Sequence, residues 1–139
     1  MEQSSKSAAV IAPAVPATRR KLRILYADDL HELRDVARIS FSREGHTIEC
    51  HADGALALAR IEEDAAFDLV ITDHHMPNMN GLEFVTQLRE RSFPGKIMVF
   101  SSELSESVAR EYRERTVDRI LYKPVFPAAL RRVLGELFP

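Results

Sequence analysis

Polar side chains follow four of the five short apolar runs in the sequence, at positions where strands of a sheet would end. They are Asp28 and Asp29, Asp73, Ser101 and Ser102, and Lys123 with Pro124. In an open parallel sheet, the carboxyl ends of the strands lie along one edge, where ligands bind. We therefore expect three carboxylates, two hydroxyls and one ammonium group to converge at that edge.

Such a set of groups is suited to phosphoryl transfer. Three crowded carboxylates repel one another unless a cation lies among them, and Mg²⁺ prefers oxygen ligands of this kind. A lysine ammonium group is a compact positive charge for a phosphate, and a serine hydroxyl can donate to a phosphoryl oxygen. Phosphoryl transfer depends mainly on positioning and charge neutralisation. A carboxylate can itself accept the phosphoryl group as an acyl phosphate.

The elements that must position these groups are five apolar runs of strand length. They cover residues 22–27, 47–50, 69–72, 97–100 and 120–122, and the second run is the weakest. Most of them are too apolar for strands with one face in water, so we expect several to be central strands of a parallel sheet.

Five helix-length stretches alternate with these runs. Their apolar positions are Leu33, Val36, Ala37 and Phe41; Leu56, Ala59 and Ile61; Phe84, Val85 and Leu88; Leu104, Val108 and Tyr112; and Leu130, Val133, Leu134 and Leu137. Asp53 is the expected N-cap of the second helix, and Pro127 opens the fifth. The alternation predicts an α/β fold: a flavodoxin-like, doubly wound five-stranded parallel sheet in the order 2-1-3-4-5 with five helices.

The composition of this 139-residue chain is that of a single globular domain. Residues 1–21 are rich in Ala, Ser and Pro, and we interpret them as a disordered leader before a domain over residues 22–139. Residues 1–21 carry one acidic and four basic side chains, so the rest of the chain carries 20 acidic and 15 basic ones. This acidic remainder argues against a basic face for nucleic acid. No apolar stretch is long enough for a membrane span, and the basic cluster follows the apolar part of the leader, unlike in a signal peptide. We expect a cytoplasmic protein that binds neither nucleic acid nor membrane.

The cysteine and the histidines of this sequence do not indicate a disulfide, a redox site or a transition-metal site. The single cysteine, Cys50, excludes an internal disulfide framework and a Cys-based zinc site, and we interpret it as a small buried hydrophobe rather than a redox sensor. His74 and His75 are adjacent, and adjacent side chains in a loop usually diverge. The other histidines, at element boundaries, are His31, His46 and His51. We expect surface histidines rather than a transition-metal site.

Four motifs in this order resemble the receiver domain of two-component response regulators, the family that includes the chemotaxis response regulator. The motifs are ILYADD at 24–29, DHHMPNMNG at 73–81, VFSS at 99–102 and Lys123-Pro124. Each lies at a predicted strand end, and the resemblance covers residues 22–139. It implies a Mg²⁺-dependent phosphoacceptor that is not an enzyme beyond its own phosphorylation from small donors and its own dephosphorylation.

The resemblance assigns roles to the matching residues. Asp73 would accept the phosphoryl group from a sensor histidine kinase or a histidine phosphotransfer protein, and it would also contact the metal. Asp29 would ligate Mg²⁺ directly and Asp28 largely through water, with the backbone carbonyl of His75 as a further ligand.

The resemblance also assigns roles to residues at the ends of the fourth and fifth predicted strands. Ser101 would hydrogen-bond the phosphoryl group and move with it, while Lys123 would pair with it. Ser102 occupies a position where the family has a small side chain, which would let the phosphodonor approach. The peptide bond from Lys123 to Pro124 is expected to be cis.

The sequence departs from the family pattern at a position that takes part in switching. The family usually has an aromatic residue three positions before the lysine, and this chain has Ile120. Tyr122 lies on the same side of the strand by alternation and could substitute in part. His75 and Glu103 occupy positions that tune dephosphorylation in the family, so we expect an altered acyl-phosphate lifetime, in a direction left open.

The leading hypothesis is a stand-alone response regulator, because only residues 127–139 follow the lysine motif. Its output would go through protein contact on the surface of the fourth helix, fifth strand and fifth helix. The apolar stripe of the fourth helix is thin, which predicts weak anchoring and easy repositioning. Transfer of the phosphoryl group onward to another histidine protein is equally allowed.

Two other classes of function stay open. Ile120 favours a receiver-like adaptor that works without phosphorylation, although the intact acidic cluster argues against it. An aspartate-nucleophile phosphatase would need a second acid two residues after Asp73, where this chain has His75.

Overall fold

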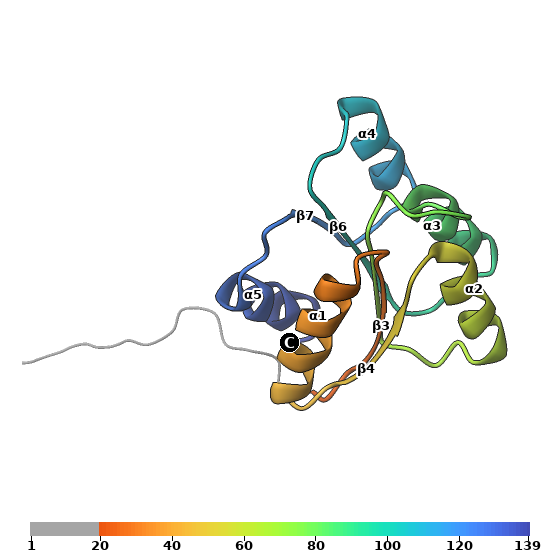
Figure 1. Cartoon of the computed structure of the whole chain (residues 1–139). Coiled ribbons are helices and arrows are strands. Elements are labelled where there is room, and N and C mark those ends of the chain that lie inside the picture. The colour runs from red at the N-terminus through yellow and green to blue at the C-terminus, as the bar shows by residue number, and fades with distance from the viewer. Residues whose placement is uncertain (1–19) are drawn as a thin grey trace, which may run out of the picture. The chain divides into compact units, whose positions relative to one another are not determined.

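The computed structural model describes residues 20–139 (Figure 1). The predicted leader, residues 1–21, lies outside the described residues except for Arg20 and Lys21. Residues Lys21–Val125 form one compact unit, which holds the sheet and four helices. Phe126–Pro139 belong with Arg20 to a second unit.

Five parallel strands make the sheet of the first unit. They are β3 (Arg23–Ala27), β4 (Thr47–His51), β5 (Leu69–Thr72), β6 (Lys96–Ser101) and β7 (Arg119–Tyr122). Their order across the sheet is β4-β3-β5-β6-β7, which confirms the predicted order 2-1-3-4-5. Ala27 pairs with Thr72, and Ser101 pairs with Tyr122. The residues after these four positions therefore leave the sheet at the same edge.

Four helices belong to the first unit. They are α1 (His31–Arg43), α2 (Gly54–Glu63), α3 (Gly81–Glu90) and α4 (Glu106–Glu114). The side chain of Asp53 caps α2 by accepting from the backbone N–H of Leu56, as predicted. Asn80 and Glu83 form a capping box at the start of α3. None of the helices within residues 20–139 has the length and apolar character to cross a membrane.

The second unit contains α5 (Pro127–Leu137), which begins with a proline as expected. Val133 and Leu134 are its buried residues. Within this unit, the guanidinium group of Arg20 lies over the ring of Phe138, 5.1 Å from its centroid.

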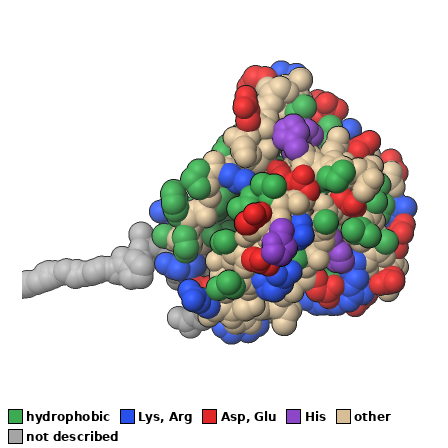
Figure 2. Space-filling view, in the orientation of Figure 1, with side chains coloured by type: hydrophobic (Ala, Val, Ile, Leu, Met, Phe, Trp, Pro, Cys, Tyr) green, Lys and Arg blue, Asp and Glu red, His purple; other side chains and the backbone are tan. Residues whose placement is uncertain are grey.

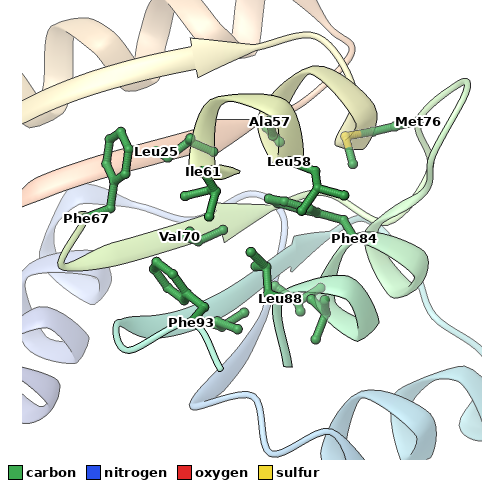
Figure 3. Close-up of a cluster of buried hydrophobic side chains, with 14 of the residues drawn as sticks. Leu25, Ala57, Leu58, Ile61, Phe67, Val70, Met76, Phe84, Leu88 and Phe93 are labelled. Atoms are coloured by element: carbon green, nitrogen blue, oxygen red, sulfur yellow. The ribbon is translucent and has the colours of Figure 1, made fainter. Parts of the chain in front are cut away.

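The main hydrophobic core lies between the sheet and helices α2, α3 and α4. Figure 3 shows Leu58 of α2 and Phe84 and Leu88 of α3 directed toward Val70 of β5. Tyr112 of α4 belongs to the same cluster and is fully buried. Helix α1 packs against β3 and β4 on the other side of the sheet (Figure 1). Burying one large apolar side chain contributes roughly 1.5–3 kcal/mol, so the cluster contributes strongly to the stability of the unit.

Three helix positions that were predicted to face the core are exposed. Val36 is 59% exposed, because the buried stripe of α1 runs through Ala37 and Phe41. Leu56 and Ala59 are also exposed. The residues that α2 buries are Gly54, Ala57, Leu58 and Ile61. A shift of one position rotates a side chain by about 100° around a helix, which suffices to turn it from core to solvent.

Helix α4 contacts α3 through polar groups as well as through its thin apolar stripe. Tyr112 and Ala109 are buried. At the end of the helix, Arg115 donates through Nε to the hydroxyl of Thr86 in α3 at 2.6 Å. Arg89 of α3 donates to the carbonyl of Arg115 at 2.9 Å. The prediction missed these two arginine contacts because they join residues far apart in the sequence.

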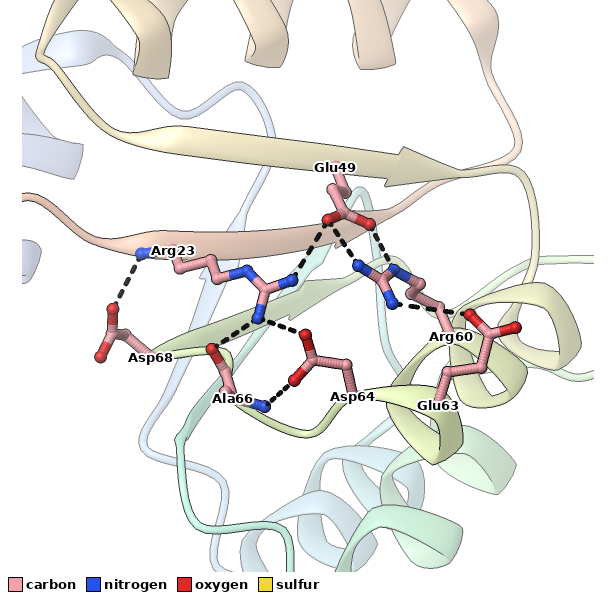
Figure 4. Close-up of polar contacts among 7 residues, drawn as sticks. All are labelled: Arg23, Glu49, Arg60, Glu63, Asp64, Ala66 and Asp68. Atoms are coloured by element: carbon pink, nitrogen blue, oxygen red, sulfur yellow. Dashed lines mark hydrogen bonds and ion pairs between the residues drawn. The ribbon is translucent and has the colours of Figure 1, made fainter.

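An ionic network ties α2 to the neighbouring strands β3 and β4 (Figure 4). Arg60 donates to both oxygens of Glu49, at 2.7 and 3.1 Å. Arg23 lies 3.5 Å from Glu49 and 2.9 Å from Asp64, and its guanidinium group stacks 4.1 Å from the ring centroid of Phe67. The network therefore joins the first residue of β3 to β4 and α2.

Candidate functional site

Three carboxylates meet at the edge of the sheet where β3 and β5 end. Asp28, Asp29 and Asp73 each offer one oxygen, and these oxygens lie within 4.8 Å of one another. Asp28 and Asp73 are buried, while Asp29 is exposed. The cluster is therefore able to bind a metal ion that arrives from solvent.

Lys123 brings a positive charge to the two buried carboxylates. Its Nζ lies 2.7 Å from Oδ2 of Asp28 and 3.5 Å from Oδ2 of Asp73. Its backbone N–H donates to the carbonyl of Ser101, and its peptide bond to Pro124 is cis, as expected. Burial raises the pKa of Asp73, and Asp28 adds to the rise while Lys123 opposes it. Three carboxyl groups lie close to one ammonium group, and a divalent cation would neutralise their excess negative charge.

Tyr26 is a site residue that the sequence analysis missed. Its hydroxyl donates to Oδ2 of Asp28 at 2.8 Å, while Oδ1 of Asp28 accepts from the backbone N–H of Leu30 at 3.0 Å. A sequence signal existed, because residues two apart in a strand face the same side. A tyrosine two positions before an aspartate can therefore reach that aspartate.

The two serines differ in exposure. Ser101 is fully buried, and its hydroxyl donates to the carbonyl of Glu103 at 3.1 Å. Ser102 is exposed. Both lie at the end of β6, next to the β7 end that carries Lys123. Their predicted roles toward a phosphoryl group stay predictions.

A surface hollow lies beside the acidic cluster. It is lined by Asp29, His74, His75, Met76, Pro77 and Asn80. Acidic side chains and histidines lie close together near the middle of the face drawn in Figure 2. His75 is exposed, so a molecule that approaches Asp73 from this side would meet its side chain.

His74 and Tyr112 form a second contact that the sequence analysis missed. Nδ1 of His74 lies 2.6 Å from the hydroxyl of Tyr112, and the two rings are edge to face with centroids 5.5 Å apart. The backbone N–H of His74 donates to Oδ1 of Asp73 at 2.7 Å. No local sequence signal could reveal this pair, because its members are far apart in the chain and come together only when α4 packs on α3.

Four further residues considered in the sequence differ in how deeply they are buried. Ile120 is partly buried against the main core, and Tyr122 is 51% exposed, so the two do not share one environment. Cys50 is half-buried rather than buried. His46 is buried, contrary to the expectation of surface histidines. Its Nδ1 accepts from the backbone N–H of Leu22 at 2.9 Å.

Comparison with known proteins agrees with this geometry. The family described as response regulator receiver domain matches residues 24–134. The sensory/regulatory protein RpfC of Xanthomonas campestris pv. campestris is 34% identical over 123 residues, covering 85% of this chain and 17% of RpfC. The sensor histidine kinase AruS of Pseudomonas aeruginosa is 32% identical over 122 residues, covering 84% of this chain and 12% of AruS. The chain thus spans only a small part of these two relatives.

A solved structure shows the same fold. The chemotaxis protein CheY4 of Vibrio cholerae aligns with a TM-score of 0.77 at 29% identity, covering 85% of this chain and 99% of CheY4. The family match includes the five strands, apart from the first residue of β3, and the three carboxylates that converge at their ends. The chain is a receiver domain of two-component signalling and belongs to the response regulator receiver domain family.

Proposed function

We propose that this receiver domain is a Mg²⁺-dependent phosphoacceptor switch in which Asp73 takes the phosphoryl group. The observation that carries the proposal is the convergence of Asp28, Asp29 and Asp73 with Lys123 at one edge of the sheet. Asp73 is 7% exposed, so its carboxylate can be reached while it stays largely shielded from water. An acyl phosphate formed in such a place is protected from indiscriminate hydrolysis.

The transfer needs only groups of this chain and a phosphodonor. A carboxylate oxygen of Asp73 attacks the phosphorus of a phosphohistidine, so that an O–P bond forms and the N–P bond breaks. The bonding electrons stay on the imidazole nitrogen of the donor, which then takes a proton. Lys123, already 3.5 Å from Asp73, moves from Asp28 toward the new phosphoryl oxygens and pairs with their charge.

The donor set fits Mg²⁺ in its chemistry. All three side chains offer carboxylate oxygens, which hard divalent cations prefer over nitrogen and sulfur. Asp29 is exposed, which leaves room for the waters that Mg²⁺ usually keeps. When bound, Mg²⁺ would neutralise charge on the phosphoryl oxygens. Asp29 would hold it directly and Asp28 largely through water, with the backbone carbonyl of His75 as a further ligand.

We infer that the phosphodonor is a sensor histidine kinase or a histidine phosphotransfer protein. AruS, to which this chain is 32% identical, is itself a sensor histidine kinase. We further propose that the domain is not an enzyme beyond its own phosphorylation and dephosphorylation, that it acts in the cytoplasm, and that its output is a protein contact on α4 and β7. An adaptor that works without phosphorylation is a second candidate, favoured by Ile120, which leaves the usual aromatic position without an aromatic ring.

The decisive experiment is phosphate-affinity gel migration with acetyl phosphate as donor, with and without Mg²⁺. Wild type, Asp73→Asn and Glu90→Gln are compared. The last variant removes a carboxylate from the exposed end of α3. A shifted band in wild type and Glu90→Gln with Mg²⁺, absent from Asp73→Asn, is the expected result. No shift in wild type, together with no Mg²⁺ binding by calorimetry, would overturn the switch in favour of the adaptor.

A further inference from the structure

A continuous line of contacts leads from the carboxylate of Asp73 to helix α4. The backbone N–H of His74 holds Oδ1 of Asp73 at 2.7 Å. The imidazole of the same residue meets the hydroxyl of Tyr112 at 2.6 Å. Tyr112 lies in α4 and is fully buried. One residue, His74, therefore contacts the proposed phosphoacceptor with its backbone and α4 with its side chain.

The start of α3 leaves space for this contact. A Cβ atom at Gly81 would lie 2.5 Å from the hydroxyl of Tyr112, and it would also collide with the carbonyl oxygen of Asp73. The backbone N–H of Gly81 donates to the carbonyl of His74 at 2.9 Å. The tyrosine hydroxyl can thus reach His74 because position 81 has no side chain.

Two arginine contacts hold the other end of α4. Arg115 donates to Thr86, and Arg89 donates to the carbonyl of Arg115. Both contacts join the C-terminal end of α4 to α3. Ile120, packed against the main core, has neither a hydroxyl nor an aromatic ring. The hydroxyl of Tyr112 contacts His74, the residue that directly follows Asp73.

We propose that His74 and Tyr112 couple the phosphorylation state of Asp73 to the position of α4. The inference rests on the proposed function. The carboxylate of Asp73 accepts a hydrogen bond from the backbone N–H of His74. Phosphorylation changes the charge of this carboxylate and converts one of its oxygens into the ester oxygen of the acyl phosphate. His74 then shifts, its contact with the Tyr112 hydroxyl is remade or lost, and α4 moves with the buried tyrosine. Tyr112 is thus a positioning residue that acts through His74.

Backbone amide NMR with Mg²⁺ and beryllofluoride, a phosphoryl mimic, tests the coupling. Wild type is expected to show shifts both in the 73–81 loop and in α4. In Tyr112→Phe, which keeps the buried ring, the loop shifts and the beryllofluoride affinity are expected to stay, while the α4 shifts at saturation fall at least about twofold. The decisive quantity is the ratio of the α4 shifts to the loop shifts. If Tyr112 had only a general structural role, Tyr112→Phe would leave this ratio unchanged.

Two further variants complete the test. His74→Ala removes the other partner of the same contact and is expected to give the same fall in the α4 shifts. This variant keeps the coupling testable if Tyr112→Phe does not fold. Thr86→Val removes a hydroxyl that contacts α4 at its far end, and it is expected to keep the wild-type ratio.

Two results would overturn the coupling: a wild-type α4 response in both Tyr112→Phe and His74→Ala, or an equal loss in Thr86→Val. If wild type shows no loop shifts at all, the proposed function fails first and the coupling fails with it.

Discussion

The hydroxyl of Tyr26 and the ammonium group of Lys123 share one acceptor, Oδ2 of Asp28, at 2.8 and 2.7 Å. Burial raises the pKa of Tyr26, and the charge of Asp28 raises it further, so the phenol stays a protonated donor at ordinary pH. The buried Asp28 carboxylate therefore keeps one neutral donor even when Lys123 turns toward Asp73.

Tyr26→Phe is expected to weaken the domain and slow its phosphorylation. A buried acceptor that loses one donor destabilises a protein by roughly 1–2 kcal/mol. Lys123 would then be the one side-chain donor to Oδ2 of Asp28 in the described structure, and it would leave that oxygen less readily. The checks are the urea midpoint of unfolding and the rate of phosphorylation by acetyl phosphate. Tyr122→Phe, at a half-exposed tyrosine, is the control and should change neither quantity.

Stability is expected to fall below about pH 6.5 because of His46. Burial lowers the pKa of His46, and its Nδ1 must be unprotonated to accept from Leu22. The unfolded chain therefore binds more protons than the folded one in this range. The stabilisation is complete above the usual pKa and is lost as pH drops through it toward the lowered folded value.

The measurement is the free energy of unfolding from about pH 8 to about pH 5. His46→Gln should flatten this dependence without removing it. His51 also has a pKa lowered by burial, so it contributes with the same sign. An unchanged slope in His46→Gln would contradict the prediction.

Gly81→Ala is expected to destabilise the domain although alanine is the better helix former. Helix propensity alone favours alanine by about 1 kcal/mol. The added Cβ would lie 2.2 Å from the carbonyl oxygen of Asp73 and 2.5 Å from the Tyr112 hydroxyl, and overpacking of this kind typically destabilises by about 1–3 kcal/mol. Chemical denaturation of Gly81→Ala, Tyr112→Phe and the double variant separates the two effects. The double variant should be more stable than additivity predicts, since phenylalanine lacks the hydroxyl. It should still be less stable than Tyr112→Phe, because the carbonyl oxygen of Asp73 stays in the way of the added Cβ.

Glu49→Gln is expected to lower stability by only about 0.5–1 kcal/mol, because the network in Figure 4 is partly exposed. The hydrogen bond from Arg60 lowers the pKa of Glu49, so this contribution is present above its usual pKa and disappears as pH falls. Added salt should reduce the difference from wild type. Glu63→Gln is the comparison, since its carboxylate is 73% exposed and lies 3.5 Å from Arg60, and its effect should be smaller.

The sequence by itself determined the sheet and the position of the acidic cluster. Apolar runs of strand length, separated by helical stretches, permit few topologies once crossovers are right-handed. In a parallel sheet every strand ends at the same edge, so Asp28, Asp73 and Lys123 had to meet there. Their convergence follows from local pattern and topology, without any knowledge of side-chain packing.

Only the tertiary structure decided which helix faces are buried and which distant side chains touch. Val36 and Leu56 face solvent because the rotation of each helix about its axis is set by its fit to the sheet, and one residue changes the direction by about 100°. The contact between His74 and Tyr112 needs α4 to pack on α3 and position 81 to lack a side chain. These conditions depend on segments far apart in the chain, and packing in three dimensions satisfies them together.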